Sequence, residues 1–103
     1  MTPQELTRLI EEDIASNRDA FHWYGRPFRD CLREPRKIRV LDSFRNDEPE
    51  DLWLVFEEAS GEEQGYKVVY HESLGAFGLA VAGTPEPVLI GFYGGFVDTL
   101  NAM

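Results

Sequence analysis

Residues 66–81 read YKVVYHESLGAFGLAV and contain two candidate β-strands joined by a short turn. The run at 66–70 is β-branched and aromatic, a composition that favours strands. Residues 72–75 then turn the chain into a second apolar run at 77–81. A turn this short joins antiparallel strands, because a parallel crossover requires a dozen or more residues. This stretch therefore predicts an antiparallel sheet.

Three further runs extend the predicted sheet. Ile38, Val40 and Phe44 alternate with polar residues, which predicts a strand at about 37–45 with Phe44 on the apolar face. After a charged turn at 46–50, the apolar run 52–56 predicts a central strand. Residues 88–90 follow the rigid turn 83–87 and predict a fifth strand. The connections are short, so we expect an antiparallel β-meander of four to five strands.

Helices are expected at both ends of this sheet. Thr2, Pro3 and Glu5 form a capping signal for a helix from about 3 to 16. An apolar stripe runs along that helix, formed by Leu6, Leu9, Ile10 and Ile14. A second stripe near the end of the chain predicts a short helix that packs on the sheet, formed by Phe96, Val97, Leu100 and Met103.

Residues 17–36 are compatible with two structures. Pro27, Phe28, Cys31 and Leu32 fit a short second helix that ends before Pro35, and a strand is the alternative. The small side chains on one face of the strand at 77–81 also have two interpretations, as a packing surface for the first helix or as the floor of a ligand pocket. We favour helix packing, because the first helix must bury its stripe.

Length and composition predict one α+β domain spanning residues 1–103. The chain has room for a single core, and its 43% hydrophobic content supports an ordered fold. Cys31 is the only cysteine, so no internal disulfide suggests an oxidising compartment. The start has no signal-peptide pattern, and no apolar run approaches the ~20 residues of a membrane span. We expect a cytoplasmic, bacterial-type protein with no membrane association.

Charge is distributed very unevenly along the chain. The net charge is −9, but residues 1–17 carry −3, residues 18–45 carry +4, and residues 46–103 carry −10. Eight carboxylates gather on the predicted strand at 52–56 or its flanking loops: Asp47, Glu48, Glu50, Asp51, Glu57, Glu58, Glu62 and Glu63. Concentrated negative charge steers association with a basic partner. These eight residues are the predicted partner-binding set.

No residue pattern predicts catalysis, a metal or a cofactor. His22 and His71 are the only histidines, and neither has the spacing of a metal site. Cys31 lies among arginines but has no accompanying catalytic signature, so a core position is favoured. The glycine-rich stretch 91–95 lacks the lysine of a phosphate-binding loop. We therefore expect a protein that is not an enzyme.

Three alternatives remain beside partner binding. The basic segment 18–45 could bind nucleic acid, but the rest of the chain repels phosphate, so we expect these arginines to pair with the protein's own carboxylates. The same segment could meet the acidic half of a second copy in a homo-oligomer. A small ligand could instead bind an aromatic cluster of Phe21, Trp23, Tyr24, Tyr93 and Phe96.

Small size, acidity and the lack of a catalytic constellation together favour a binding protein. In these respects the chain resembles the immunity proteins that bacteria keep against basic nuclease toxins. The resemblance is one of general character and rests on no shared motif. It implies a non-enzymatic inhibitor whose carboxylates meet a cationic protein.

Overall fold

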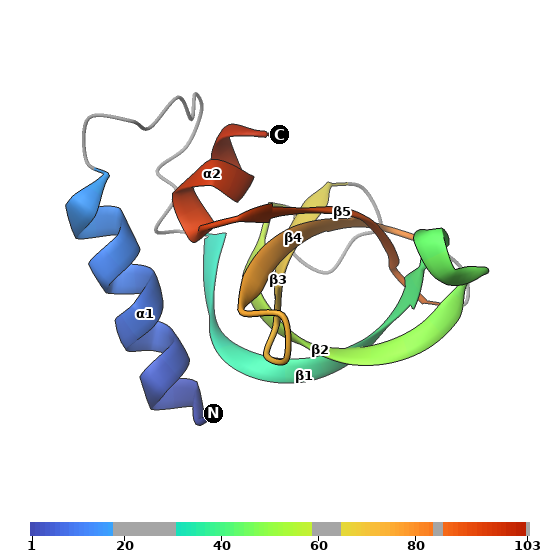
Figure 1. The fold of residues 1–103 in the computed structure, drawn as a ribbon, viewed down its shortest axis with the longest axis horizontal. Coiled ribbons are helices and arrows are strands. Elements are labelled where there is room, and N and C mark those ends of the chain that lie inside the picture. Colours follow the sequence, from blue (N-terminus) through green and yellow to red (C-terminus); the bar gives the residue numbers. More distant parts are fainter. Residues whose placement is uncertain (18–30, 59–64, 84–85, 103) are drawn as a thin grey trace.

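The computed structural model describes residues 1–17, 31–58, 65–83 and 86–102. In it, five strands form one sheet that curls into a closed barrel, and two helices lie against the outside of the barrel (Figure 1). This arrangement confirms the predicted α+β fold and its antiparallel meander. Within the described ranges, no helix is both long enough and apolar enough to cross a membrane.

The elements follow one another in the order helix, five strands, helix. They are α1 (Pro3–Ser16), β1 (Leu32–Asp42), the 3-10 turn η3 (Ser43–Arg45), β2 (Glu48–Glu57), β3 (Tyr66–His71), β4 (Ala76–Val81), β5 (Val88–Gly94) and α2 (Phe96–Asn101). Each strand pairs antiparallel with the next one. Parallel pairing of Leu41 with Val88 and of Asp42 with Leu89 closes the barrel between β1 and β5.

Several boundaries differ from the sequence prediction, including the end of β5, which continues beyond the predicted 88–90 to Gly94. β1 begins at Leu32, so the strand alternative is correct from that residue, and residues 18–30 lie outside the described part of the chain. β1 ends at Asp42 instead of continuing to 45, because the chain turns there into η3. β2 begins at Glu48, within the predicted charged turn, because residues 48–50 already pair with the end of β1.

The strands alone supply the interior of the barrel. Its buried cluster consists of Val40, Leu52, Leu54, Val69 and Leu89. Gly78 of β4 pairs with Val69 of this cluster and lies on the same face of the sheet. There is no room for a larger residue at Gly78. A Cβ added at Gly78 would lie 2.5 Å from the carbonyl oxygen of Gly91 and 2.8 Å from the ring of Phe92. The prediction that this face receives the first helix is therefore wrong, because β5 fills the space.

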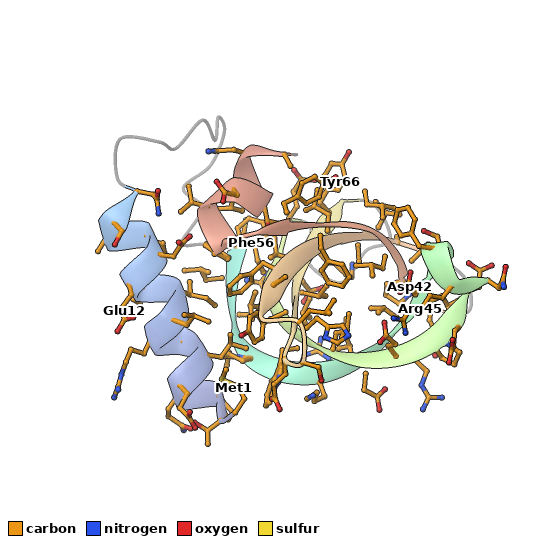
Figure 2. The ribbon with its side chains drawn as sticks, in the orientation of Figure 1. Met1, Glu12, Asp42, Arg45, Phe56 and Tyr66 are labelled. Atoms are coloured by element: carbon orange, nitrogen blue, oxygen red, sulfur yellow. The ribbon has the colours of Figure 1, made fainter. Side chains whose placement is uncertain are left out.

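The helices cover the outer face of the barrel. α1 lies against β1 and α2, and it buries Leu6, Ile10 and Ile14, whereas Leu9 stays 37% exposed. Phe96 of α2 is fully buried between Phe56 and Phe77, with ring centroids 6.3 and 5.7 Å away. Figure 2 shows Phe56 beneath α2 at this junction. The second, larger hydrophobic core thus lies between barrel and helices.

Candidate protein-binding surface

The turn between β1 and β2, residues 43–47, forms the end of the molecule opposite α1 (Figure 1). Asp42 and Arg45 mark this end in Figure 2, far from Glu12 on α1 and from Met1, which precedes it. Two of the predicted partner-binding residues lie here, because Asp47 ends the turn and Glu48 begins β2, and both are exposed.

The buried carboxylate of Asp42 organises the turn. Asp42 is 5% exposed, and its Oδ1 accepts the backbone N–H of Phe44 at 2.9 Å. Its carbonyl oxygen accepts the N–H of Asp47 at 2.9 Å, which closes the loop. Asn46 and Asp47 adopt left-handed backbone angles, with φ of 56° and 58°. Asn and Asp tolerate this conformation better than other residues with a Cβ, which explains their presence here.

A side-chain hydrogen bond ties the turn to β5, the strand that pairs with the end of β1. The Ser43 hydroxyl donates to the carbonyl oxygen of Leu89 in β5 at 2.7 Å. The guanidinium of Arg45 lies 3.9 Å from the Asp42 carboxylate. The turn is therefore fixed to β5 as well as to the strands that it connects.

Phe44 projects from this turn with 72% of its surface exposed. Its predicted place on the apolar face of a strand is wrong, because the chain leaves the strand at Asp42 and the alternation stops there. The sequence contains a signal for this ending. Asp42 and Ser43 are helix-capping residues, and Asn46 and Asp47 favour turns.

Two other carboxylates of the predicted set lie at the far end of β2 and have partners. Glu57 ends β2, and its carboxylate is surrounded by Arg33, Arg36 and Lys67 at 3.7 to 3.8 Å. The Glu58 carboxylate accepts the backbone N–H of Tyr66 at 3.2 Å. The length of β2 separates these two residues from Asp47 and Glu48. Glu62 and Glu63 lie outside the described residues.

Two acidic residues in the first half of β2 also have partners. Asp51 lies 3.6 Å from the guanidinium of Arg39 on β1. Glu50 lies 3.1 Å from Nε2 of His71 on β3. Within the described ranges, no ion pair involves Asp47 or Glu48. Among the described members of the predicted set, these two residues are therefore the ones that remain open to a partner.

The described arginines of the 18–45 segment lie close to the chain's own carboxylates. Arg33, Arg36, Arg39 and Arg45 are each within ion-pair distance of one. Lys37 lies over the Trp53 ring, with its ammonium 4.9 Å from the ring centroid. For these four arginines, the structure agrees with the prediction that the arginines pair internally.

His71 is half-buried, and both of its ring nitrogens are occupied. Nδ1 accepts the backbone N–H of Leu74 at 3.2 Å, so Nε2 carries the proton and donates to Glu50. A general base needs an unprotonated nitrogen directed at its substrate. In this arrangement neither nitrogen is available, and the pair acts as a structural link between β2 and β3.

Cys31 and the glycine-rich stretch, the two other places with candidate chemistry, also have structural roles. Cys31 is 1% exposed and packs in the core between barrel and helices. In the glycine-rich stretch 91–95, Gly95 precedes α2. One of the free N–H groups in the first turn of that helix, at Val97, donates to the Asp13 carboxylate at 2.8 Å. An anion that the chain itself supplies already fills this helix terminus.

The predicted aromatic cluster is not assembled in the part of the chain that the structure describes. Phe96 is fully buried in the core, whereas Tyr93 is 43% exposed. Phe21, Trp23 and Tyr24 lie outside the described residues. One depression among the described residues has a volume of about 240 Å³ and includes Lys37, His71 and Ser73 in its lining. It is smaller than the about 300–1,000 Å³ that ligand sites usually enclose.

Comparison of the chain with models of protein families, with curated proteins and with solved structures gives no match.

Proposed function

We propose that this protein is a non-enzymatic binding domain for a basic protein partner, acting in the manner of an inhibitor or immunity protein. One observation carries the proposal. The described residues include fifteen acidic and seven basic side chains, and five of the seven basic ones are within ion-pair distance of the chain's own carboxylates. The charge left for a partner is therefore negative.

An acidic field of this kind favours encounter with a cationic protein. Complementary charge raises association rates by about 10- to 1,000-fold, and the effect weakens as salt screens it. The same field repels the phosphates of nucleic acids, which supports a protein as the partner.

Self-association is the weaker alternative. It requires the basic segment 18–45 to be available to the acidic half of a second copy. Arg33 and Arg36 instead lie beside Glu57, and Arg39 lies beside Asp51 of the same chain. A second copy would have to compete with pairs that are already formed.

The test is the salt dependence of a complex formed with a partner from the native cell. The immobilised chain captures proteins from a cell extract, mass spectrometry identifies them, and binding kinetics are then measured with the purified partner. Between about 0.1 M and about 1 M salt, the screening length falls from about 10 Å to about 3 Å. We expect a partner with net positive charge whose association rate falls at least about tenfold over this range. An association rate independent of salt would contradict the proposal.

A further inference from the structure

We propose that Phe44 is the anchor of the docking surface, and that it inserts into an apolar pocket rimmed by lysine and arginine side chains on the basic partner. The inference rests on the proposed function and deepens it, because it names the contact residue and the chemistry that recognises it.

The Phe44 side chain is largely exposed to solvent. Phe44, at 72%, is the most exposed of the large hydrophobic side chains in the described ranges, ahead of Leu74 at 59%. A buried aromatic side chain covers about 150–250 Å², and aromatic residues often contribute most of the affinity of an interface. Because Phe44 contributes little to the protein's own core, its ring is available to a partner.

The turn that carries Phe44 is held by several hydrogen bonds. Phe44 is held by the buried Asp42 carboxylate through its own N–H, and the neighbouring Ser43 is bound to β5. A further backbone bond closes the turn at Asp47. A side chain on a fixed backbone loses less conformational freedom on binding than one on a loose loop. Phe44 is therefore presented in a preorganised position.

Charge around the ring identifies the partner. Asp47, in the same turn as Phe44, and Glu48, which follows it, are both exposed, whereas the nearby cation, Arg45, lies against Asp42. The free charge at this end of the molecule is negative, so a complementary pocket has a basic rim. Anionic lipid headgroups would be repelled by the same carboxylates, which favours a protein pocket over a membrane surface.

A library of random dodecapeptides displayed on phage tests the inference without knowledge of the natural partner. Peptides selected on the immobilised full chain are synthesised, and their affinities are measured by fluorescence polarisation. We expect peptides in which Lys or Arg flanks apolar residues. Phe44→Ala should weaken their binding about tenfold or more. Leu74→Ala, which truncates another exposed apolar side chain, is the matched control and should leave binding unchanged.

Two charge variants locate the acidic contribution. Asp47→Asn combined with Glu48→Gln removes two negative charges beside Phe44, and Glu5→Gln combined with Glu12→Gln removes two from the exposed side of α1. Because both variants change the net charge equally, a slower association with the first alone supports the turn as the docking site. Equal slowing by both would overturn this location.

The outcomes separate the inference from the proposed function. If Phe44→Ala binds the selected peptides as tightly as the unaltered chain while binding still weakens with salt, the inference is wrong and the proposed function stands. If no basic peptide is enriched, the inference is overturned, whereas the proposed function is decided by the salt dependence of the captured complex. Thermal unfolding of each variant is the control for folding, and the exposed position of Phe44 predicts an unchanged melting temperature.

Discussion

Glu72 lies in the turn between β3 and β4, where its carboxylate accepts the indole N–H of Trp53 at 3.2 Å and lies 3.7 Å from the N-terminal ammonium. The hydrogen bond from Trp53, together with the charges of the N-terminus and Lys37, holds the pKa of Glu72 below its ordinary value of 4.5. The ionised carboxylate therefore has more favourable contacts in the folded chain than in the unfolded one.

The lowered pKa predicts a contribution to stability that depends on pH. For a carboxyl group whose pKa falls on folding, the contribution is complete above the unfolded value of 4.5 and disappears as the pH falls through the folded value. Glu72→Gln keeps an oxygen for Trp53 but removes the charge. We expect the variant to be less stable than the parent at about pH 6 and equal to it well below the folded pKa.

Urea unfolding at a series of pH values measures the difference between the two proteins. Trp53 fluorescence follows the same titration directly, because its indole N–H binds the carboxylate. A stability difference of the same size at every pH would contradict this account.

Gly78 lies where β4 and β5 approach too closely for a side chain. Since an added Cβ would approach the Gly91 carbonyl to 2.5 Å, Gly78→Ala forces the strands apart. Overpacking of this kind typically costs about 1–3 kcal/mol of unfolding free energy. Gly75→Asn is the control, because a Cβ there meets nothing within 4 Å and asparagine tolerates the φ of +64°. Chemical denaturation of both variants should show a substantial loss for Gly78→Ala alone.

Among the helices, the contact between α1 and α2 depends on Asp13. Its carboxylate accepts the Val97 N–H at 2.8 Å, so a residue of the first helix caps the last one. Asp13→Ala should lower the unfolding free energy by about 0.5–2 kcal/mol, the usual effect of losing an N-cap. Asp13→Asn keeps a hydrogen-bond acceptor and should lose less. Equal stability of all three proteins would show that the cap contributes nothing.

The elements that the sequence predicts correctly are those set by local pattern. The stripe at Leu6, Ile10 and Ile14 and the apolar runs at 66–70 and 77–81 form the expected helix and strands. The start of β1 was ambiguous because Pro35 and several charges interrupt its pattern. Alternation alone does not show where a strand ends, so the sequence pattern wrongly places Phe44 on the apolar face of β1.

For the molecule as a whole, closure of the barrel could not be predicted from the sequence. The short loops indicate which strands are neighbours, but the pairing of Leu41 with Val88 joins residues that are far apart in the chain. Likewise, the sequence predicts that the strand keeps the two acidic loops at opposite ends, but it does not show which carboxylates already have partners. A strand places its two ends far apart, and the pairing of Glu57 with Arg33 and Lys67 depends on the sheet that surrounds it.

The few pairs that close the barrel have a consequence for folding kinetics. Contacts between residues distant in sequence form slowly, because a long loop must first be closed. We expect the β1–β5 pairing to form after the transition state, once the β2–β4 meander is in place. Leu89→Ala removes a fully buried side chain at the β1–β5 pairing and should accelerate unfolding while leaving the folding rate unchanged.

Val69→Ala is the counterpart within the meander, because Val69 is equally buried and pairs with strands on both sides. Stopped-flow measurements should show that this variant refolds more slowly. If Leu89→Ala slowed refolding to the same extent, the two ends of the sheet would have to meet early. In the order expected here, the β1–β5 pairing is the last to form and the first to open.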